Sequence, residues 1–360
     1  VKQLDSWKPS SGSMRTKTIT ISNSGEHTIK VQYYEGTGAA RLKFDIVPTY
    51  YKDTTEVHYN WGTSSPDPNV PADHFYATFN QQKTLSAGDY FVQTLADDRV
   101  RVEFDGNSVI NQWEDSSGKI NRAVLNVKSG THNIKTLYYE NTGAASVFSD
   151  IVPFNSWLAY YYNNENLSGK PENAQIISPQ SDGSLYKDYG SDSPMTNVKA
   201  DGFSARYVTA KHLKPGYYVI RTRADDGIRV LVDGKKVLDR WTKSSYREDQ
   251  VTVHLNNNDG SDVHWIEVQY LEGTGVAKVN ATIKPVDDIL TNDSWFAEFY
   301  NTESFGGTPH DIGGEGSFKQ IDDLNFDWGT DSPIDGVPKD HFSAVFQKKM
   351  NLQAGKYEIL

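Results

Sequence analysis

Hydrophobic and polar residues alternate along much of the chain. Residues 27–33 (HTIKVQY) and 265–270 (WIEVQY) show a period of two, with β-branched and aromatic residues in segments bounded by Gly and Asn. Because alternate residues of a β-strand face the same side, this pattern predicts strands that bury one face. We expect strands throughout the chain.

Composition favours the same class of fold. The 360 residues include 21 Tyr, 15 Phe and 8 Trp, and aromatic side chains are enriched in sheets. We therefore expect an all-β protein. Cysteine is absent, which excludes disulfide scaffolds, thiolate metal sites and cysteine nucleophiles. Its absence also fits an extracellular or cell-surface bacterial protein.

Charge and hydropathy argue against two classes of partner. The formal net charge is −11, whereas phosphate backbones and anionic membrane surfaces attract clustered Lys and Arg. No apolar run approaches the roughly 18 residues of a membrane-spanning helix. We expect no nucleic-acid partner and no membrane insertion. Val1 falls within a repeat, so we expect the gene product to start upstream.

Two short motifs recur and divide the chain into repeated units. The first, Trp/Tyr-Gly-x-x-Ser-Pro, starts at Trp61, Tyr189 and Trp328 and each time leads into Asp-x-Phe-x-Ala. The second motif follows a predicted strand and occupies residues 34–39, 139–144 and 271–276. The register predicts four units: residues 1–48 as the C-terminal part of a first repeat, 49–152 as a second, 153–287 as a complete third, and 288–360 as the N-terminal part of a fourth.

The second unit is shortened at its start. The third unit opens with residues 157–163 (WLAYYYN), whereas the second has only Tyr50, Tyr51 and Lys52 at that place. Either the unit is trimmed, or a neighbouring repeat or chain supplies its opening strand. No Gly/Ser-rich linker separates the units, so we expect them to pack closely.

The dipeptide Asp-Asp occurs at the same place in two units, as Asp97-Asp98 and Asp225-Asp226. Adjacent side chains of a regular strand point to opposite faces, so both carboxylates reach one ion only if the backbone is distorted. Either a cation binds the pair, or one Asp caps a turn and the other is solvated. The surrounding loops offer oxygen atoms, which Ca²⁺ prefers as ligands.

The combined motifs resemble the PA14 domain family. The match is best over residues 157–281, which contain Trp-x-x-x-Tyr-Tyr-Asn, Tyr-Gly-x-x-Ser-Pro, Asp-x-Phe-Ser-Ala-Arg and Ala-Asp-Asp-Gly-Ile-Arg-Val. The family includes domains of yeast flocculins and fungal epithelial adhesins and modules of bacterial glycosidases. The resemblance implies tandem antiparallel β-sandwiches, each with loops at one end that bind calcium and sugar.

The resemblance also implies a set of ligands. In the sugar-binding members a cis-linked Asp-Asp pair binds calcium, and a second loop supplies an Asn side chain and two main-chain carbonyl groups. The corresponding residues are Asp97, Asp98, Glu140, Thr142 and Ala144 in the second unit, and Asp225, Asp226, Glu272, Thr274 and Val276 in the third. Glu140 and Glu272 replace the Asn, and each either binds the metal or organises its loop as a hydrogen-bond acceptor.

Three residues are candidates for direct contact with a sugar. Trp113 and Trp241 occupy one position in their units, where an exposed ring would stack on a pyranose, although a Trp at a fixed position also serves as a core anchor. Asn141 lies in the candidate calcium loop. We expect no catalysis, because adjacent carboxylates cannot straddle a glycosidic bond and no nucleophile elbow, phosphate loop or dinucleotide motif occurs.

The sequence therefore predicts calcium-dependent carbohydrate-binding or adhesion modules of a secreted or cell-surface bacterial protein, with a host, biofilm or cell-wall glycan as the partner. Two alternatives remain: a calcium-stiffened stalk or filament without ligand binding, and an accessory region of a larger secreted enzyme or toxin. An open coordination position facing solvent favours sugar recognition. A position closed by Glu140 or Glu272 favours a structural role.

Overall fold

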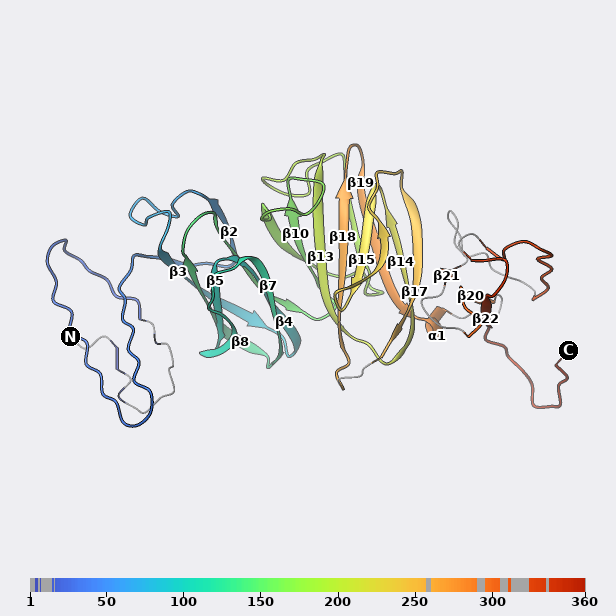
Figure 1. Cartoon of the computed structure of the whole chain (residues 1–360), viewed down its shortest axis with the longest axis horizontal. Coiled ribbons are helices and arrows are strands. Elements are labelled where there is room, and N and C mark those ends of the chain that lie inside the picture. Colours follow the sequence, from blue (N-terminus) through green and yellow to red (C-terminus); the bar gives the residue numbers. More distant parts are fainter. Residues whose placement is uncertain are drawn as a thin grey trace.

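The structure is a computed structural model in which residues 4–5, 7, 15, 17–256, 260–289, 295–304, 310–311, 324–334 and 337–359 are described. Strands form nearly all of the regular structure, and the helix found in these residues is four residues long. Figure 1 shows two sandwiches following one another along the long axis, with the chain termini at opposite ends. The predicted all-β class, with tandem sandwiches, is confirmed. None of the helices in the described ranges is long and apolar enough to span a membrane.

The second unit contains two sheets, with strand orders β1-β3-β8-β5-β6 and β2-β9-β4-β7. Buried residues alternate along β3 at Phe75, Ala77 and Phe79, as a strand with one face on the core requires. The strands are β1 (Thr49–Asp53), β2 (Val57–Gly62), β3 (Phe75–Leu85), β4 (Gly88–Asp97), β5 (Arg99–Phe104), β6 (Asn107–Gln112), β7 (Ser117–Val127), β8 (Gly130–Glu140) and β9 (Ala145–Pro153).

The third unit repeats this plan with one more strand. Its sheets have the orders β11-β10-β13-β18-β15-β16 and β12-β19-β14-β17. The strands are β10 (Trp157–Tyr162), β11 (Asn173–Ile177), β12 (Leu185–Gly190), β13 (Phe203–His212), β14 (Gly216–Ala224), β15 (Gly227–Val232), β16 (Lys235–Arg240), β17 (Arg247–Leu255), β18 (Val263–Glu272) and β19 (Ala277–Pro285).

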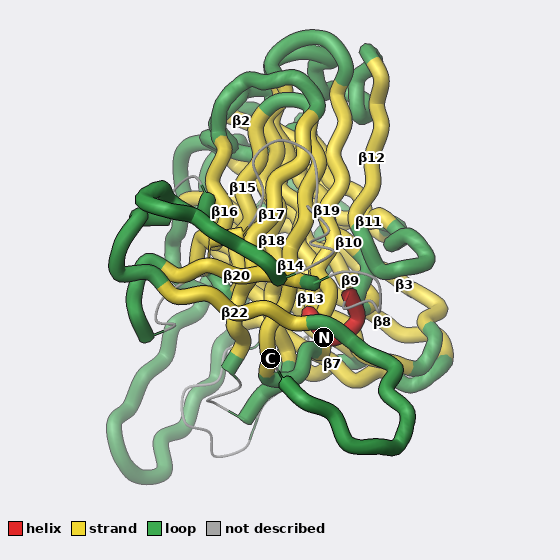
Figure 2. Tube along the Cα trace, turned by 90° about the vertical axis from the view of Figure 1, so that its right-hand side faces the viewer, coloured by secondary structure: helices red, strands yellow, loops and turns green. Residues whose placement is uncertain are grey.

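The described part of the fourth unit forms a small sheet of order β21-β20-β22. It follows the short helix α1 (Val286–Ile289) and consists of β20 (Phe296–Tyr300), β21 (His310–Asp311) and β22 (Ser343–Gln347). Figure 2, which views the molecule from its C-terminal end, shows β20 and β22 in front of the strands of the third unit. Phe296 of β20 packs there with Val219 and Val286.

The opening strand of the second unit comes from its own chain and runs in the opposite direction. β1 pairs with β3 in parallel, whereas its counterpart β10 pairs with β13 antiparallel. β1 nevertheless places an aromatic residue at the same point of the sheet as β10 does. Tyr50 lies opposite Ala77, as Tyr161 lies opposite Ala205. Tyr50 packs edge-on against Trp61 at a centroid distance of 6.0 Å. The position beside β3 is therefore occupied by β1 of the same unit and not by a strand from another repeat or chain.

Residues 17–48 contain no strand, so the prediction of a strand at residues 27–33 is wrong. Ile29, Val31 and Tyr33, which were expected to be buried, are 47%, 43% and 44% exposed. A strand requires a hydrogen-bonded neighbour and an apolar surface to pack against. The described residues provide neither to this segment.

A separate hydrophobic cluster joins the second and third units. β10 is buried on both faces: Tyr161 belongs to the core of the third unit, whereas Tyr160 and Tyr162 face the second unit. They pack with Phe91 and Phe148 of the second unit, and the rings of Phe148 and Tyr160 meet at 5.8 Å in an edge-on arrangement. The two sandwiches thus share a buried apolar contact.

Candidate metal and carbohydrate site

Both Asp-Asp pairs lie where the chain crosses from one sheet of a sandwich to the other. In the second unit β4 ends at Asp97 and β5 begins at Arg99; in the third, β14 ends at Ala224 and β15 begins at Gly227. The adjacent strand of each unit, β8 or β18, ends at the candidate glutamate, Glu140 or Glu272. The fold therefore brings the two predicted loops together at one end of each sandwich.

In the third unit, Asp226 organises the loop. Its carboxylate accepts hydrogen bonds from the backbone N–H of Ser244 at 2.9 Å and of Gly273 at 2.6 Å. Its carbonyl oxygen accepts a bond of 2.6 Å from the Arg240 guanidinium. The backbone of Asp226 has φ 67°, and Asp tolerates this left-handed conformation better than most residues. Asp226 thereby ties the crossover to the loop after β18.

Asp225 differs from its neighbour. Its carboxylate makes no ion pair and no hydrogen bond to another side chain in the described part of the chain, and it is only partly buried. Burial raises the pKa of Asp225, and the adjacent Asp226 carboxylate raises it further. This carboxylate is available to a ligand that brings positive charge.

Glu272 is fully buried beside the pair. Its Oε2 atom accepts a hydrogen bond of 2.6 Å from the Tyr270 hydroxyl, whereas Oε1 is buried without a hydrogen-bond partner. Burial raises the pKa of Glu272 to about 7, and the carboxylates of Asp226 and Asp225 also raise it. A buried carboxylate oxygen without a partner is costly unless a cation or donor reaches it.

The loop after β18 is also fixed by the Asp-x-Phe motif of the same unit. Asp201, from the Asp-x-Phe motif, accepts a hydrogen bond of 2.9 Å from the backbone N–H of Gly275. The backbone of Gly273 passes close to Asp226, since an added Cβ would lie 3.0 Å from Oδ2. These contacts fix the segment that carries the carbonyl groups of Thr274 and Val276.

One lysine lies close to this loop. The Lys243 side chain passes over Gly273, but its Nζ forms an ion pair of 2.7 Å with Glu165 Oε1. Both members of that pair are largely exposed. Lys243 is thus directed to Glu165, and it leaves the carboxylates of Asp225 and Glu272 without an ion pair.

The second unit has the same framework with different details. The Asp97–Asp98 peptide bond is cis, the only cis bond in the described ranges, so the third unit lacks the cis linkage that the resemblance implies. Asp98 is buried and accepts a hydrogen bond of 2.8 Å from the backbone N–H of Asn141. The Tyr138 hydroxyl contacts both the Asp97 carbonyl and the Glu140 carboxylate. Burial raises the pKa of Glu140 to about 7.

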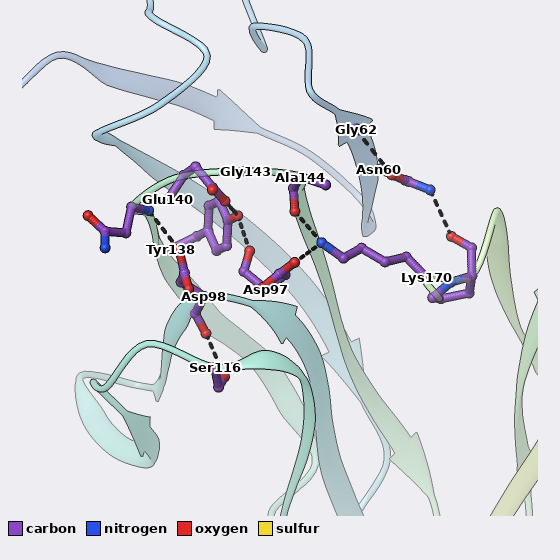
Figure 3. Close-up of polar contacts among 12 residues, drawn as sticks. Asn60, Gly62, Asp97, Asp98, Ser116, Tyr138, Glu140, Gly143, Ala144 and Lys170 are labelled. Carbon is purple, nitrogen blue, oxygen red and sulfur yellow. Dashed lines mark hydrogen bonds and ion pairs between the residues drawn. The ribbon is translucent and has the colours of Figure 1, made fainter. Parts of the chain in front are cut away.

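A lysine from the third unit enters the site of the second unit. Lys170 lies in the loop between β10 and β11, and its Nζ contacts the Asp97 carboxylate and the Ala144 carbonyl oxygen (Figure 3). These are two of the atoms predicted to bind calcium. Burial lowers the pKa of Lys170 to about 8, so the ammonium form predominates at neutral pH. The second unit therefore already has a cation at this position.

The candidate sugar-binding residues lie at the edge of the site. Trp113 and Trp241 belong to neither core and are half-buried, because the guanidinium groups of Arg101 and Arg229 cover one face of each ring at 5.0 and 4.3 Å. The core-anchor interpretation is therefore wrong for both. The Asn141 side-chain amide donates to Asp115 Oδ2 at 3.2 Å.

The third unit fits calcium better than the second. It offers the Asp225 carboxylate, the unpartnered Oε1 of Glu272 and the loop carbonyl groups, all of them the hard oxygen donors that calcium takes. Side chains alone do not enclose an ion, since no group of three or more His, Asp or Glu residues converges as a metal site in the described residues. Main-chain oxygens would have to contribute. In the second unit the Lys170 ammonium group contacts two of the predicted ligands, the Asp97 carboxylate and the Ala144 carbonyl oxygen.

Comparison with known sequences identifies the family. The sequence profile of the PA14 domain matches residues 39–153 and 155–288, which together are more than half of the chain. The chain belongs to the PA14 domain family. The predicted resemblance is thereby confirmed, and the two matched segments cover the two complete sandwiches of the structure.

Several proteins are similar to these PA14 units. Anti-sigma-I factor RsgI3 of Acetivibrio thermocellus is 22% identical in an alignment 307 residues long that covers 78% of this chain and 46% of that protein. The chain thus spans less than half of that relative. Among solved structures, an anti-sigma factor domain-containing protein from Clostridium clariflavum is 18% identical, with a TM-score of 0.32, over 65% of this chain and 88% of that one. A PA14 sugar-binding domain from an RTX adhesin is 16% identical, with a TM-score of 0.27, over 37% and 90%.

Sequence reasoning missed three kinds of residue in these PA14 units. Tyr138 and Tyr270 hold the glutamates, and the Tyr-x-Glu spacing could have indicated this because residues two apart share a strand face. Asp201 was treated as a marker of the repeat, but it anchors the loop. Lys170 could not be assigned without knowing how the two units pack.

Proposed function

We propose that this chain consists of carbohydrate-binding modules and that the third PA14 unit carries a calcium-dependent site. The observation that supports this most strongly is the combination of the unpaired Asp225 carboxylate with the buried, unpartnered Oε1 of Glu272 at the end of the sandwich. Both groups favour a cation. Family membership is compatible with the same site.

Each residue has a part in the proposed site. Asp225 and Glu272 would supply carboxylate oxygens, and Thr274 and Val276 would supply carbonyl oxygens. Asp226 acts mainly as a positioning residue, since its carboxylate binds the backbone N–H groups of Ser244 and Gly273. When bound, calcium would provide open coordination positions for sugar hydroxyl groups.

We propose Trp241 as the apolar part of the sugar subsite. It directly follows β16, next to Arg240, which holds the Asp226 carbonyl group. One face of its ring is covered by Arg229, so a pyranose would contact another part of the ring. Aromatic rings at the edge of a polar site are suited to this contact because they combine apolar area with few rotatable bonds.

We propose that the modules are not catalytic. Asp225 and Asp226 are adjacent on one crossover, and Asp226 is occupied by backbone N–H groups. They cannot flank a glycosidic bond from two sides, as the acid and base of a glycosidase do. A glycan recognised here would be bound at the cell surface or outside the cell, which is where we place the protein.

A glycan array tests this proposal directly. The chain is applied in calcium and again in EDTA, together with Asp225→Asn and the matched control Asp288→Asn. Asp288 is exposed and lies beyond the far end of β19. We expect binding of some glycans by the wild type and the control in calcium, and loss of that binding in EDTA and in Asp225→Asn. Binding that survives EDTA and both variants would rule out this site.

A structural role is the second candidate, and the packing of the units favours it. The cluster around Tyr160 and Phe148 buries apolar surface between two sandwiches, as a stiff stalk requires. In this case calcium would still stabilise the third unit, but no glycan would bind. The similarity to RsgI3 adds a related possibility, that these units are the ligand-binding part of a longer regulatory protein. Glycan binding is expected in that case too.

A further inference from the structure

The second PA14 unit has the loops of a metal site but is contacted by a cation from the third unit. The Lys170 Nζ atom contacts the Asp97 carboxylate and the Ala144 carbonyl oxygen at once. Figure 3 shows the side chain reaching across from the neighbouring unit toward both groups. One is an anionic oxygen and the other a neutral oxygen. Both can accept hydrogen bonds from an ammonium group, as they could coordinate a metal.

The loop that carries Lys170 is itself fixed against the second unit. Pro171, the next residue, is buried, and its carbonyl oxygen accepts a hydrogen bond of 3.3 Å from the Asn60 side-chain amide. Glu172 N–H donates to the Tyr161 carbonyl at 2.8 Å, which ties the loop to β10. The position of Lys170 is therefore set by packing on both sides, and its side chain is mostly buried, with 16% exposed.

The residue of the fourth unit that corresponds to Lys170 in the sequence is not a lysine. At the corresponding place of the fourth unit the sequence reads Gly307-Thr308-Pro309 where the third unit reads Gly169-Lys170-Pro171. Residues 307–309 lie outside the described residues, but a threonine hydroxyl carries no charge in any position. The two following repeats thus differ in the type of residue at this sequence position.

We infer that Lys170 is the resident cation of the second unit's loop site, where it takes the place of a metal and fastens the third unit to the second. The charge of Asp97 is then neutralised within the chain, and calcium is left to the third unit alone. The Lys170 ammonium group carries one charge and makes directional hydrogen bonds, so this site connects the third unit to the second. The statement about calcium rests on the function proposed above, whereas the fastening does not.

The first test counts calcium ions by calorimetric titration. We expect one equivalent per wild-type chain and two for Lys170→Met, because the substitution frees Asp97 and Ala144. Lys214→Met, which removes an exposed lysine of the third unit, should keep one equivalent. Two equivalents in the wild type, or one in both the wild type and Lys170→Met, would overturn the inference.

The second test measures the fastening in EDTA, without any metal. Lys170→Met, Asp97→Asn and the double variant form a cycle of thermal unfolding measurements. We expect each single variant to lower the unfolding temperature by several degrees and the double variant to lower it by less than their sum. Additive effects, or an unchanged unfolding temperature of Lys170→Met, would overturn the inference.

The two failures can be told apart. If neither the wild type nor Lys170→Met binds calcium, the proposed calcium site of the third unit is wrong. The thermal unfolding measurements in EDTA then decide the role of Lys170. Lys170→Arg provides a check on folding, since it keeps the charge and should retain most of the wild-type unfolding temperature in EDTA. A loss in Lys170→Arg equal to that in Lys170→Met would contradict a role for the charge.

Discussion

Asp225 and Asp226 are adjacent but have different surroundings, and the difference decides what each does. Asp226 is 7% exposed and accepts two backbone N–H groups, whereas Asp225 makes no ion pair within the described residues. The sequence left two possibilities, that both residues bind one ion or that one Asp accepts backbone N–H groups while the other is solvated, and the contacts of Asp226 match the second. In the third unit Asp226 organises the loop, and we propose Asp225 as the residue of the pair that binds the ligand.

Replacing each Asp by Asn separates these roles. We expect Asp226→Asn to lower the free energy of unfolding by ~1–3 kcal/mol, because Asn has a single acceptor oxygen and leaves one buried N–H unpaired. Asp225→Asn should change it by less than about 0.5 kcal/mol in EDTA, yet weaken calcium binding at least about tenfold, a loss of ~1.4 kcal/mol. Urea unfolding in EDTA and calcium titration provide the two measurements. Equal losses of stability in both variants would contradict the division.

The sequence located the two loops of each site but not the other side chains that contact them. Repetition marked the Asp-Asp pairs and the loops that contain Glu140 and Glu272, and the resemblance to the PA14 family implied that the two loops form one site. The pattern could not show that Lys170 enters the second site, because the residue is distant in sequence and belongs to another repeat. It also could not distinguish Trp113 and Trp241 from core residues, since only the positions of Arg101 and Arg229 place them at the surface.

At the scale of elements, β10 has two functions. The segment shows no alternation of apolar and polar residues, and both faces of the strand are buried because the second unit covers Tyr160 and Tyr162. The run of six apolar and aromatic residues was compatible with this, since strands buried on both faces lack alternation. The opposite case is residues 27–33, where alternation is present but the described chain supplies no neighbouring strand.

Truncation of Tyr160 tests the contact between the units. We expect Tyr160→Ala to lower the free energy of unfolding by ~3–5 kcal/mol, as for other large buried aromatic residues, and to separate one calorimetric transition into two. Tyr160→Phe should retain most of the stability, because it keeps the buried ring and its apolar contacts. A single unchanged transition in Tyr160→Ala would show that the cluster does not couple the sandwiches.

His212 lies between the second and third units, and we expect its contribution to stability to depend on pH. It contacts Asp262 in its own unit at 2.9 Å and Asp89 of the second unit at 3.1 Å, and hydrogen bonds to these two carboxylates raise its pKa. A raised pKa means that His212 stabilises the folded state below the unfolded-state pKa of ~6.5, and that this stabilisation is lost as pH rises through the higher folded value. The difference in unfolding temperature between the wild type and His212→Gln should therefore be largest near pH 6 and shrink toward pH 8. A constant difference would contradict this.

At the scale of the whole molecule, two PA14 sandwiches of one design have different chemistry at equivalent loops. The second is completed by its own chain, with β1 at its edge and Lys170 in its site. In the third, the buried Oε1 atom of Glu272 has no hydrogen-bond partner and Asp225 makes no ion pair, as far as the described residues show. We therefore propose that the second unit has a supporting role and that the third binds a ligand, with the buried cluster joining the two.

The central claim is that the third unit binds calcium through Asp225 and Glu272, and thermal unfolding in calcium and in EDTA tests it most directly. At a calcium concentration of about 100 times the dissociation constant, binding adds ~2.7 kcal/mol to the stability of the unit, which corresponds to a shift of roughly 5–10 °C. We predict this shift for the wild type and for Asp288→Asn, and its loss in Asp225→Asn. Identical unfolding temperatures of the wild type in calcium and in EDTA would contradict the claim.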